Sequence, residues 1–141
     1  MKKILLLALV VLGTIAAVSC NKEDDKITNK MVLRGQTYTF VHAICANMQG
    51  FVHVDLDTKG GVLHGYGGFE SSLIGKTTDL KGGFFLSFNP QEGPSIDPQI
   101  KSGTVTVKEV DKGLHIKVDA VEEGGEKFTM DVYTEDMGEN F

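Results

Sequence analysis

The 141-residue chain contains no tryptophan, has only three prolines and carries fewer basic than acidic residues. Sugar-binding surfaces often stack the sugar on the flat face of a tryptophan ring. Glycan binding here would therefore have to rely on Tyr38, Tyr66 or Tyr133. All three prolines lie within 89–101, which we therefore expect to be a loop or a sheet edge. The 14 basic and 19 acidic residues make the chain acidic, which argues against a nucleic-acid partner.

The first twenty residues have the composition of an export signal. Lys2 and Lys3 precede an uncharged apolar run at 4–18, which ends in small residues before Cys20. This order is typical of a secretory signal peptide. The run of 15 residues is shorter than the about 20 that a membrane-spanning helix needs, which makes an N-terminal transmembrane helix the less favoured alternative. The cysteine after the small residues resembles a bacterial lipoprotein signal, which implies cleavage before Cys20 and lipid such as palmitate on its sulfur.

A short acidic segment follows the cysteine. Residues 20–30 are polar and highly charged, so we expect them to form a flexible tether. Lys22, Glu23, Asp24 and Asp25 are similar to the export motif of lipoproteins from the Bacteroidetes phylum. That resemblance implies an outer-membrane protein, held by its lipid and exposed on the cell surface, with a periplasm-facing position as the alternative.

Removing residues 1–19 leaves an acidic mature chain. It keeps 12 basic and 19 acidic residues, a formal charge of 12 − 19 = −7. Residues 31–141 are enough for a single domain with a real core. If lipid occupies Cys20, Cys45 has no intramolecular partner, and its apolar neighbours predict a buried small side chain rather than a catalytic thiol.

Alternating polar and apolar residues dominate from residue 36 onward, and no segment has the pattern of a long amphipathic helix. Seven strands are predicted, at 36–45, 51–57, 62–69, 84–88, 103–110, 114–121 and 127–134. The segment 71–83 breaks the pattern. Asp111, Lys112 and Gly113 fit a three-residue hairpin loop with the glycine in the left-handed conformation.

One apolar face per strand predicts an all-β fold. The inward-facing residues are predicted to be Val52, Val54, Leu56, Phe84, Leu86, Phe88, Val105, Val107, Leu114, Ile116, Val118, Ala120, Phe128, Met130 and Val132. We favour an antiparallel β-sandwich of about seven to eight strands, with a lipocalin-like β-barrel as the alternative. The segments 65–80 and 102–108 resemble small β-rich Bacteroidetes lipoproteins of uncharacterised function. This resemblance, over about 35–135, implies the same two folds and no catalytic residues.

Three histidines recur every 11 residues, at His42, His53 and His64, each in a predicted strand. If the strands pair, the imidazoles could lie near Asp55 and Asp57 and bind a divalent metal ion. The favoured interpretation is that they are solvent-facing residues whose spacing reflects strand and turn length. We therefore expect no metal or other cofactor.

The preferred functional hypothesis is a non-enzymatic binding or accessory module of an outer-membrane complex, tethered by lipid on Cys20 to the membrane and with an outer-membrane protein as partner. One alternative is a carrier for a small apolar ligand inside a lipocalin-like barrel. The least favoured alternative is a metal-assisted enzyme that uses the three histidines. No residue pattern identifies the ligand.

Overall fold

The computed structural model describes residues 26–137. The predicted signal peptide, Cys20 and the acidic motif at 22–25 lie outside the described residues. The described part is all β, with two single turns of 3-10 helix and no α-helix. Between residues 26 and 137 there is no helix with the length and hydrophobicity needed to span a membrane.

The described elements are nine strands and two short turns. They are β1 (Lys30–Leu33), β2 (Gln36–Met48), β3 (Phe51–Thr58), η1 (Lys59–Gly61), β4 (Leu63–Glu70), η2 (Ser71–Leu73), β5 (Thr77–Asp79), β6 (Phe84–Pro90), β7 (Ile100–Val110), β8 (Gly113–Glu122) and β9 (Lys127–Asp136). The seven predicted strands are all present. The structure adds β1 and β5, which have only four and three residues, too few for an alternating pattern to be recognised.

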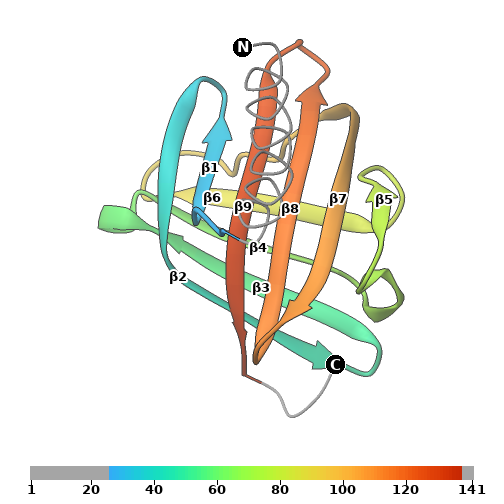
Figure 1. Ribbon diagram of the computed structural model, residues 1–141. Coiled ribbons are helices and arrows are strands. Elements are labelled where there is room, and N and C mark those ends of the chain that lie inside the picture. The colour runs from blue at the N-terminus through green and yellow to red at the C-terminus, as the bar shows by residue number, and fades with distance from the viewer. Residues whose placement is uncertain (1–25, 138–141) are drawn as a thin grey trace, which may run out of the picture.

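The strands form one sheet in the order β5-β7-β8-β9-β1-β2-β3-β4-β6, which curls into a half-barrel. Figure 1 shows β5, β7, β8, β9 and β1 running steeply, with β3, β4 and β6 crossing behind them. The predicted all-β antiparallel fold is confirmed. β1 pairs with β2 on one side and with β9 on the other, and so joins the two halves into a continuous sheet.

The curvature of the sheet comes from the long strand β2. Its first part pairs with β1 and its later part with β3, and its register with β3 shifts between Phe40 and His42. Such a bulge bends a strand and increases its twist. The far end of β2 also meets β9 in a short parallel pairing, Ile44 with Glu135 and Cys45 with Asp136. The bend in β2 therefore turns one sheet into two facing halves.

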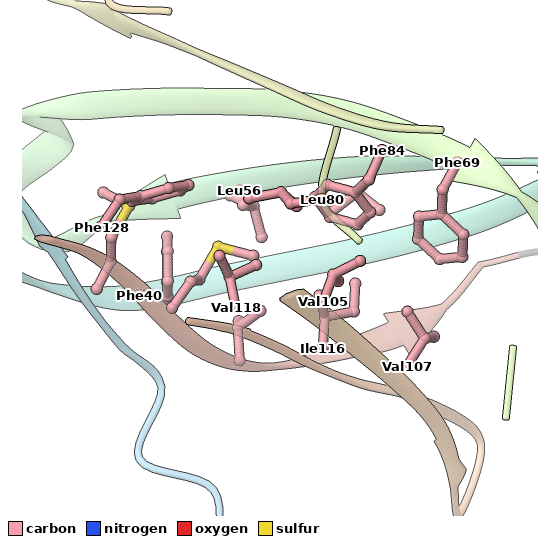
Figure 2. Close-up of a cluster of buried hydrophobic side chains, with 14 of the residues drawn as sticks. Phe40, Leu56, Phe69, Leu80, Phe84, Val105, Val107, Ile116, Val118 and Phe128 are labelled. Carbon is pink, nitrogen blue, oxygen red and sulfur yellow. The ribbon is translucent and has the colours of Figure 1, made fainter. Parts of the chain in front are cut away.

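The core lies between the two halves and matches the predicted inward faces. Figure 2 shows Phe69, Phe84 and Leu80 opposite Val105, Val107 and Ile116. Of the predicted inward residues, all are buried except Leu86, which is half-buried at the edge strand β6.

The hairpin between β7 and β8 corrects one prediction. Val110 pairs directly with Gly113, so the loop holds only residues 111 and 112. Asp111, with a φ of 51°, takes the left-handed conformation predicted for Gly113. A Cβ on Gly113 would lie 2.1 Å from the carbonyl oxygen of Thr134. Glycine is therefore needed at 113 because β9 approaches closely, and the turn itself does not require it.

The prolines sit where β6 ends and the chain leaves the sheet. The predicted loop at 89–101 is shorter than expected, because β6 continues to Pro90 and β7 begins at Ile100. Within the loop, Ile96 bridges back to Phe88. The segment is therefore a loop, as one of the two predicted alternatives states, with a single bridge to the edge strand β6.

Candidate functional site

A cavity of about 420 Å³ lies along β6, one of the two edge strands at which the half-barrel stays open. We call it the seam cavity. It is lined by Tyr66, Leu80, Phe84, Phe85, Leu86, Ser87, Ser95, Asp97, Pro98, Ile100 and Phe128. These residues come from β4, β6, β7, β9 and the loops on either side of β6.

The walls of the seam cavity differ in polarity from one end to the other. Leu80, Phe84 and Phe128 belong to the buried core, and their side chains form an apolar wall. Ser95 and Asp97 are exposed on the loop that follows β6. The hydroxyl of Ser87, which is buried, donates a hydrogen bond to Oδ1 of Asp97. The cavity is therefore apolar within and polar at its mouth.

The edge of β6 beside Leu86 stays unpaired because of the loop residues that run past it. Phe88 and Ile96 exchange two backbone hydrogen bonds, with N···O distances of 2.9 and 2.6 Å. If this antiparallel pairing continued, Pro98 would stand opposite Leu86. Proline has no N–H to donate, so the ladder cannot extend in that direction. The edge of β6 beside Leu86 faces the cavity instead of another strand.

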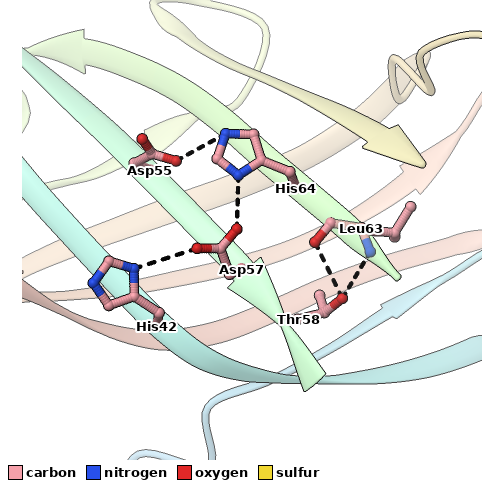
Figure 3. Close-up of polar contacts among 6 residues, drawn as sticks. All are labelled: His42, Asp55, Asp57, Thr58, Leu63 and His64. Carbon is pink, nitrogen blue, oxygen red and sulfur yellow. Dashed lines mark hydrogen bonds and ion pairs between the residues drawn. The ribbon is translucent and has the colours of Figure 1, made fainter. Parts of the chain in front are cut away.

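A second polar feature lies on the outer face of β2, β3 and β4. His42 and His64 are the direct cross-strand neighbours of Asp57. Nδ1 of His42 is 3.3 Å and Nδ1 of His64 is 2.7 Å from the Asp57 carboxylate, while Nε2 of His64 is 3.0 Å from Oδ1 of Asp55. Figure 3 shows these four side chains, which we call the histidine–aspartate row.

The row changes the ionisation of its central residues. The hydrogen bond that the His64 ring donates to Asp57 raises the pKa of His64 above its ordinary 6.5; partial burial opposes this shift, and the nearby Asp55 charge adds to it. The same hydrogen bond lowers the pKa of Asp57 below its ordinary 3.8. The contacts therefore favour a charged imidazolium between two carboxylates, on a surface where water screens their attraction.

Substitution of His64 by glutamine is expected to flatten the pH dependence of stability. A histidine whose pKa is higher in the folded state contributes stability that is complete below its ordinary 6.5 and is lost as the pH rises through the folded value. Thermal unfolding between about pH 5.5 and 8.5 should therefore show a smaller loss of stability for His64→Gln than for the wild type.

The matched control is His53→Gln, which removes an imidazole from the same outer face. The ring of His53 packs edge-on against Phe51, with centroids 5.0 Å apart. This variant should keep the wild-type pH slope. Equal slopes for wild type and His64→Gln would show that the row does not shift the ionisation of His64.

The three predicted histidines are only partly brought together. His42 and His64 share Asp57, whereas His53 lies against Phe51. Across residues 26–137, no three side chains of His, Cys, Asp or Glu are arranged to hold a metal ion. The row is thus a chain of ion pairs, in which each imidazole faces a carboxylate.

Cys45 is buried as predicted, with 2% of its surface exposed. Its sulfur lies 3.8 Å from the carbonyl oxygen of Thr134. Burial raises the pKa of the thiol to about 11. The side chain therefore remains a protonated thiol at neutral pH, which suits a packing role rather than a nucleophilic one.

A smaller groove of about 290 Å³ lies on the outer face of the same half of the sheet, beside the row. We call it the outer groove, and its lining includes His53, Asp55, Tyr66 and Phe85. Tyr66 is 45% exposed and Phe85 is 50% exposed. Tyr66 borders both this groove and the seam cavity.

Sequence reasoning did not identify Ser87, Asp97 or the rest of the seam cavity. The only signal available was that Asp97 and Pro98 lie in the segment 89–101, which was predicted to be a loop or a sheet edge. The sequence could not show that Leu80, Ile100 and Phe128 lie next to that segment, because they are distant from one another along the chain. Only the curled sheet places them around one space.

Comparison with known proteins adds no relative from which a function could be transferred. No protein-family model, curated protein or solved structure matches the chain. The functional argument therefore depends on the residues and geometry described above.

Proposed function

We propose that this protein is a non-enzymatic binding module, anchored at the outer membrane by lipid on Cys20 and exposed on the cell surface. We further propose that its domain carries a small, largely apolar ligand in the seam cavity. The observation that supports this function is a cavity of about 420 Å³ with an apolar interior and a few polar groups at its mouth. Ligand pockets typically have volumes of about 300–1,000 Å³ and this distribution of polarity.

The residues around the seam cavity favour binding over catalysis. Its polar side chains are Tyr66, Ser87, Ser95 and Asp97. Ser87 donates its hydrogen bond to a carboxylate, and the described lining offers no imidazole that could activate the hydroxyl as a nucleophile. The proposed function needs no cofactor.

Filling the seam cavity should abolish binding of an apolar probe. Leu86 is half-buried in its wall, and Leu86→Trp places a large ring in the space. We expect N-phenylnaphthylamine, a neutral apolar fluorophore, to bind the wild type saturably and the variant at least about tenfold more weakly. Fluorescence titration of the purified full-length protein measures both constants, and mass spectrometry of a solvent extract would identify the bound natural ligand.

The control for this titration is Val41→Trp, which adds the same ring at an exposed site in the bend of β2. Val41 is 62% exposed and is not part of the cavity wall. The control should bind the probe like the wild type. Absence of saturable binding to the wild type would contradict the carrier function.

The exposed aromatic side chains favour a second candidate, an accessory module of an outer-membrane complex. Phe85 stacks on Phe51 with ring centroids 6.2 Å apart, and with Tyr66 they place aromatic surface on the outer face. Aromatic residues are enriched in protein interfaces. Cross-linking in intact cells, followed by mass spectrometry, should recover one outer-membrane protein in stoichiometric amount from the wild type and less from Phe85→Lys. Recovery of no such protein would leave only the carrier function.

A further inference from the structure

We infer that the seam cavity selects its ligand by the charge of the head group and takes an amphiphile with a cationic amine at one end. This inference rests on the proposed binding function and concerns the chemistry of the ligand. The apolar wall of Leu80, Phe84 and Phe128 suits a hydrocarbon body. The exposed Asp97 at the mouth suits a group that donates hydrogen bonds and carries positive charge.

Asp97 is held in place at the mouth rather than projecting freely into water. Ser87 donates a hydrogen bond to its Oδ1 from the neighbouring strand β6, and Gln99 donates through its side-chain nitrogen to the Asp97 backbone oxygen at 3.1 Å. An ionised carboxylate has several acceptor positions, so the bond from Ser87 leaves others for a ligand. A carboxylate oriented in advance loses less conformational entropy when an ammonium group binds.

The charges around the cavity favour a cationic head group over an anionic one. Asp97 is the single ionised group in the described lining, which includes no Lys, Arg or His. Lys81 and Lys101 follow the lining residues Leu80 and Ile100, but both are exposed and neither lines the cavity. A fatty acid would therefore bring its carboxylate next to Asp97 without a counter-ion, whereas an amine would gain an ion pair.

The net charge of the chain acts in the same direction. The mature chain is acidic, so its long-range field favours the approach of cations over anions. Because the mouth is exposed, the ion pair should be modest in strength and sensitive to salt. The apolar body of the ligand supplies most of the binding free energy, and its head group decides whether an amine binds more tightly than an alcohol or a carboxylate.

Three probes of equal chain length test this inference: dodecylamine, dodecanol and dodecanoate. Each displaces N-phenylnaphthylamine from the full-length protein in a fluorescence titration below its micelle concentration. We expect the wild type to bind dodecylamine about threefold to tenfold more tightly than dodecanol, and dodecanoate most weakly. Raising the salt concentration should reduce the advantage of the amine.

Asp97→Asn removes the charge and keeps an oxygen that can accept the hydrogen bond from Ser87. This variant should bind amine and alcohol within about twofold of each other and should bind dodecanoate better than the wild type does. The matched control, Asp119→Asn, removes an exposed charge from β8 outside the cavity and should keep the wild-type order. Circular dichroism and thermal unfolding of both variants report whether the fold is retained.

The outcomes separate the inference from the function on which it rests. If the wild type binds all three probes equally, or if Asp97→Asn folds and keeps the amine preference, charge selection is wrong and the carrier function stands. If the amine preference in the wild type does not change with salt, charge selection is also wrong. If none of the three probes displaces a fluorophore that the wild type binds, the inference is wrong and the carrier function stands; if the wild type does not bind the fluorophore, both are wrong.

Discussion

Replacing Phe69 by alanine is expected to lower the free energy of unfolding by about 3–5 kcal/mol. Phe69 lies in β4 and has no exposed surface. Its ring stacks on Phe84 with centroids 5.3 Å apart and an interplanar angle of 14°. The substitution removes buried apolar surface and leaves a cavity between the two halves of the sheet, where Figure 2 shows the ring. Urea unfolding followed by circular dichroism measures the loss as a lower midpoint with an unchanged slope.

Phe85→Ala is the matched control for this experiment. Phe85 is in the adjacent strand β6 and loses the same ring, but it is 50% exposed on the outer face. Truncation should cost at most about 1 kcal/mol, mainly from the stacked contact with Phe51. Similar losses for the two variants would mean that the facing halves do not share a single packed core.

Replacing Cys20 by serine is expected to abolish attachment of lipid to the protein completely. Each acyl methylene buried in a bilayer contributes about 0.8 kcal/mol, and several chains together make detachment negligible. A serine has no thiol to carry the proposed lipid, and residues 20–141 are acidic and are therefore not attracted to an anionic membrane surface. Metabolic labelling with palmitate in the native host measures the loss of lipid, and the intact mass shows whether residues 1–19 remain.

Cys45→Ala is the control for the anchoring experiment. It removes the other cysteine, which is buried in β2, so labelling and intact mass should match the wild type apart from the substitution. The intact mass of the wild-type protein separates the two interpretations of the first twenty residues. A wild type that keeps residues 1–19 and takes up no palmitate would contradict the lipoprotein interpretation and favour a transmembrane helix at 4–18.

The strands were predictable because their evidence is local. In β8, Leu114, Ile116, Val118 and Ala120 alternate with polar or exposed residues, and this period of two places them on one face whatever they pack against. β1 could not be recognised in the same way, because four residues give no clear period. Yet β1 pairs with both β2 and β9 and so joins the two facing halves into one sheet.

The candidate sites were less predictable than the strands. The regular spacing of His42, His53 and His64 indicated proximity, and pairing does place His42 and His64 on either side of Asp57. The spacing could not show that His53 packs against Phe51 instead, since side-chain contacts depend on rotamers and neighbours. No local pattern indicated the seam cavity, because its walls come from β4, β6, β7 and β9.

The sequence by itself determined the all-β class, the inward face of most strands and the acidic charge, and from its first 25 residues we still predict the anchor. Each of these follows from composition or from residues adjacent in the chain. The tertiary structure decided that the sheet curls through the bend in β2, that Pro98 ends the pairing at β6, and that Asp97 stands at the mouth of an apolar cavity. These features depend on contacts between segments far apart in sequence, whose approach is decided by packing and strand register.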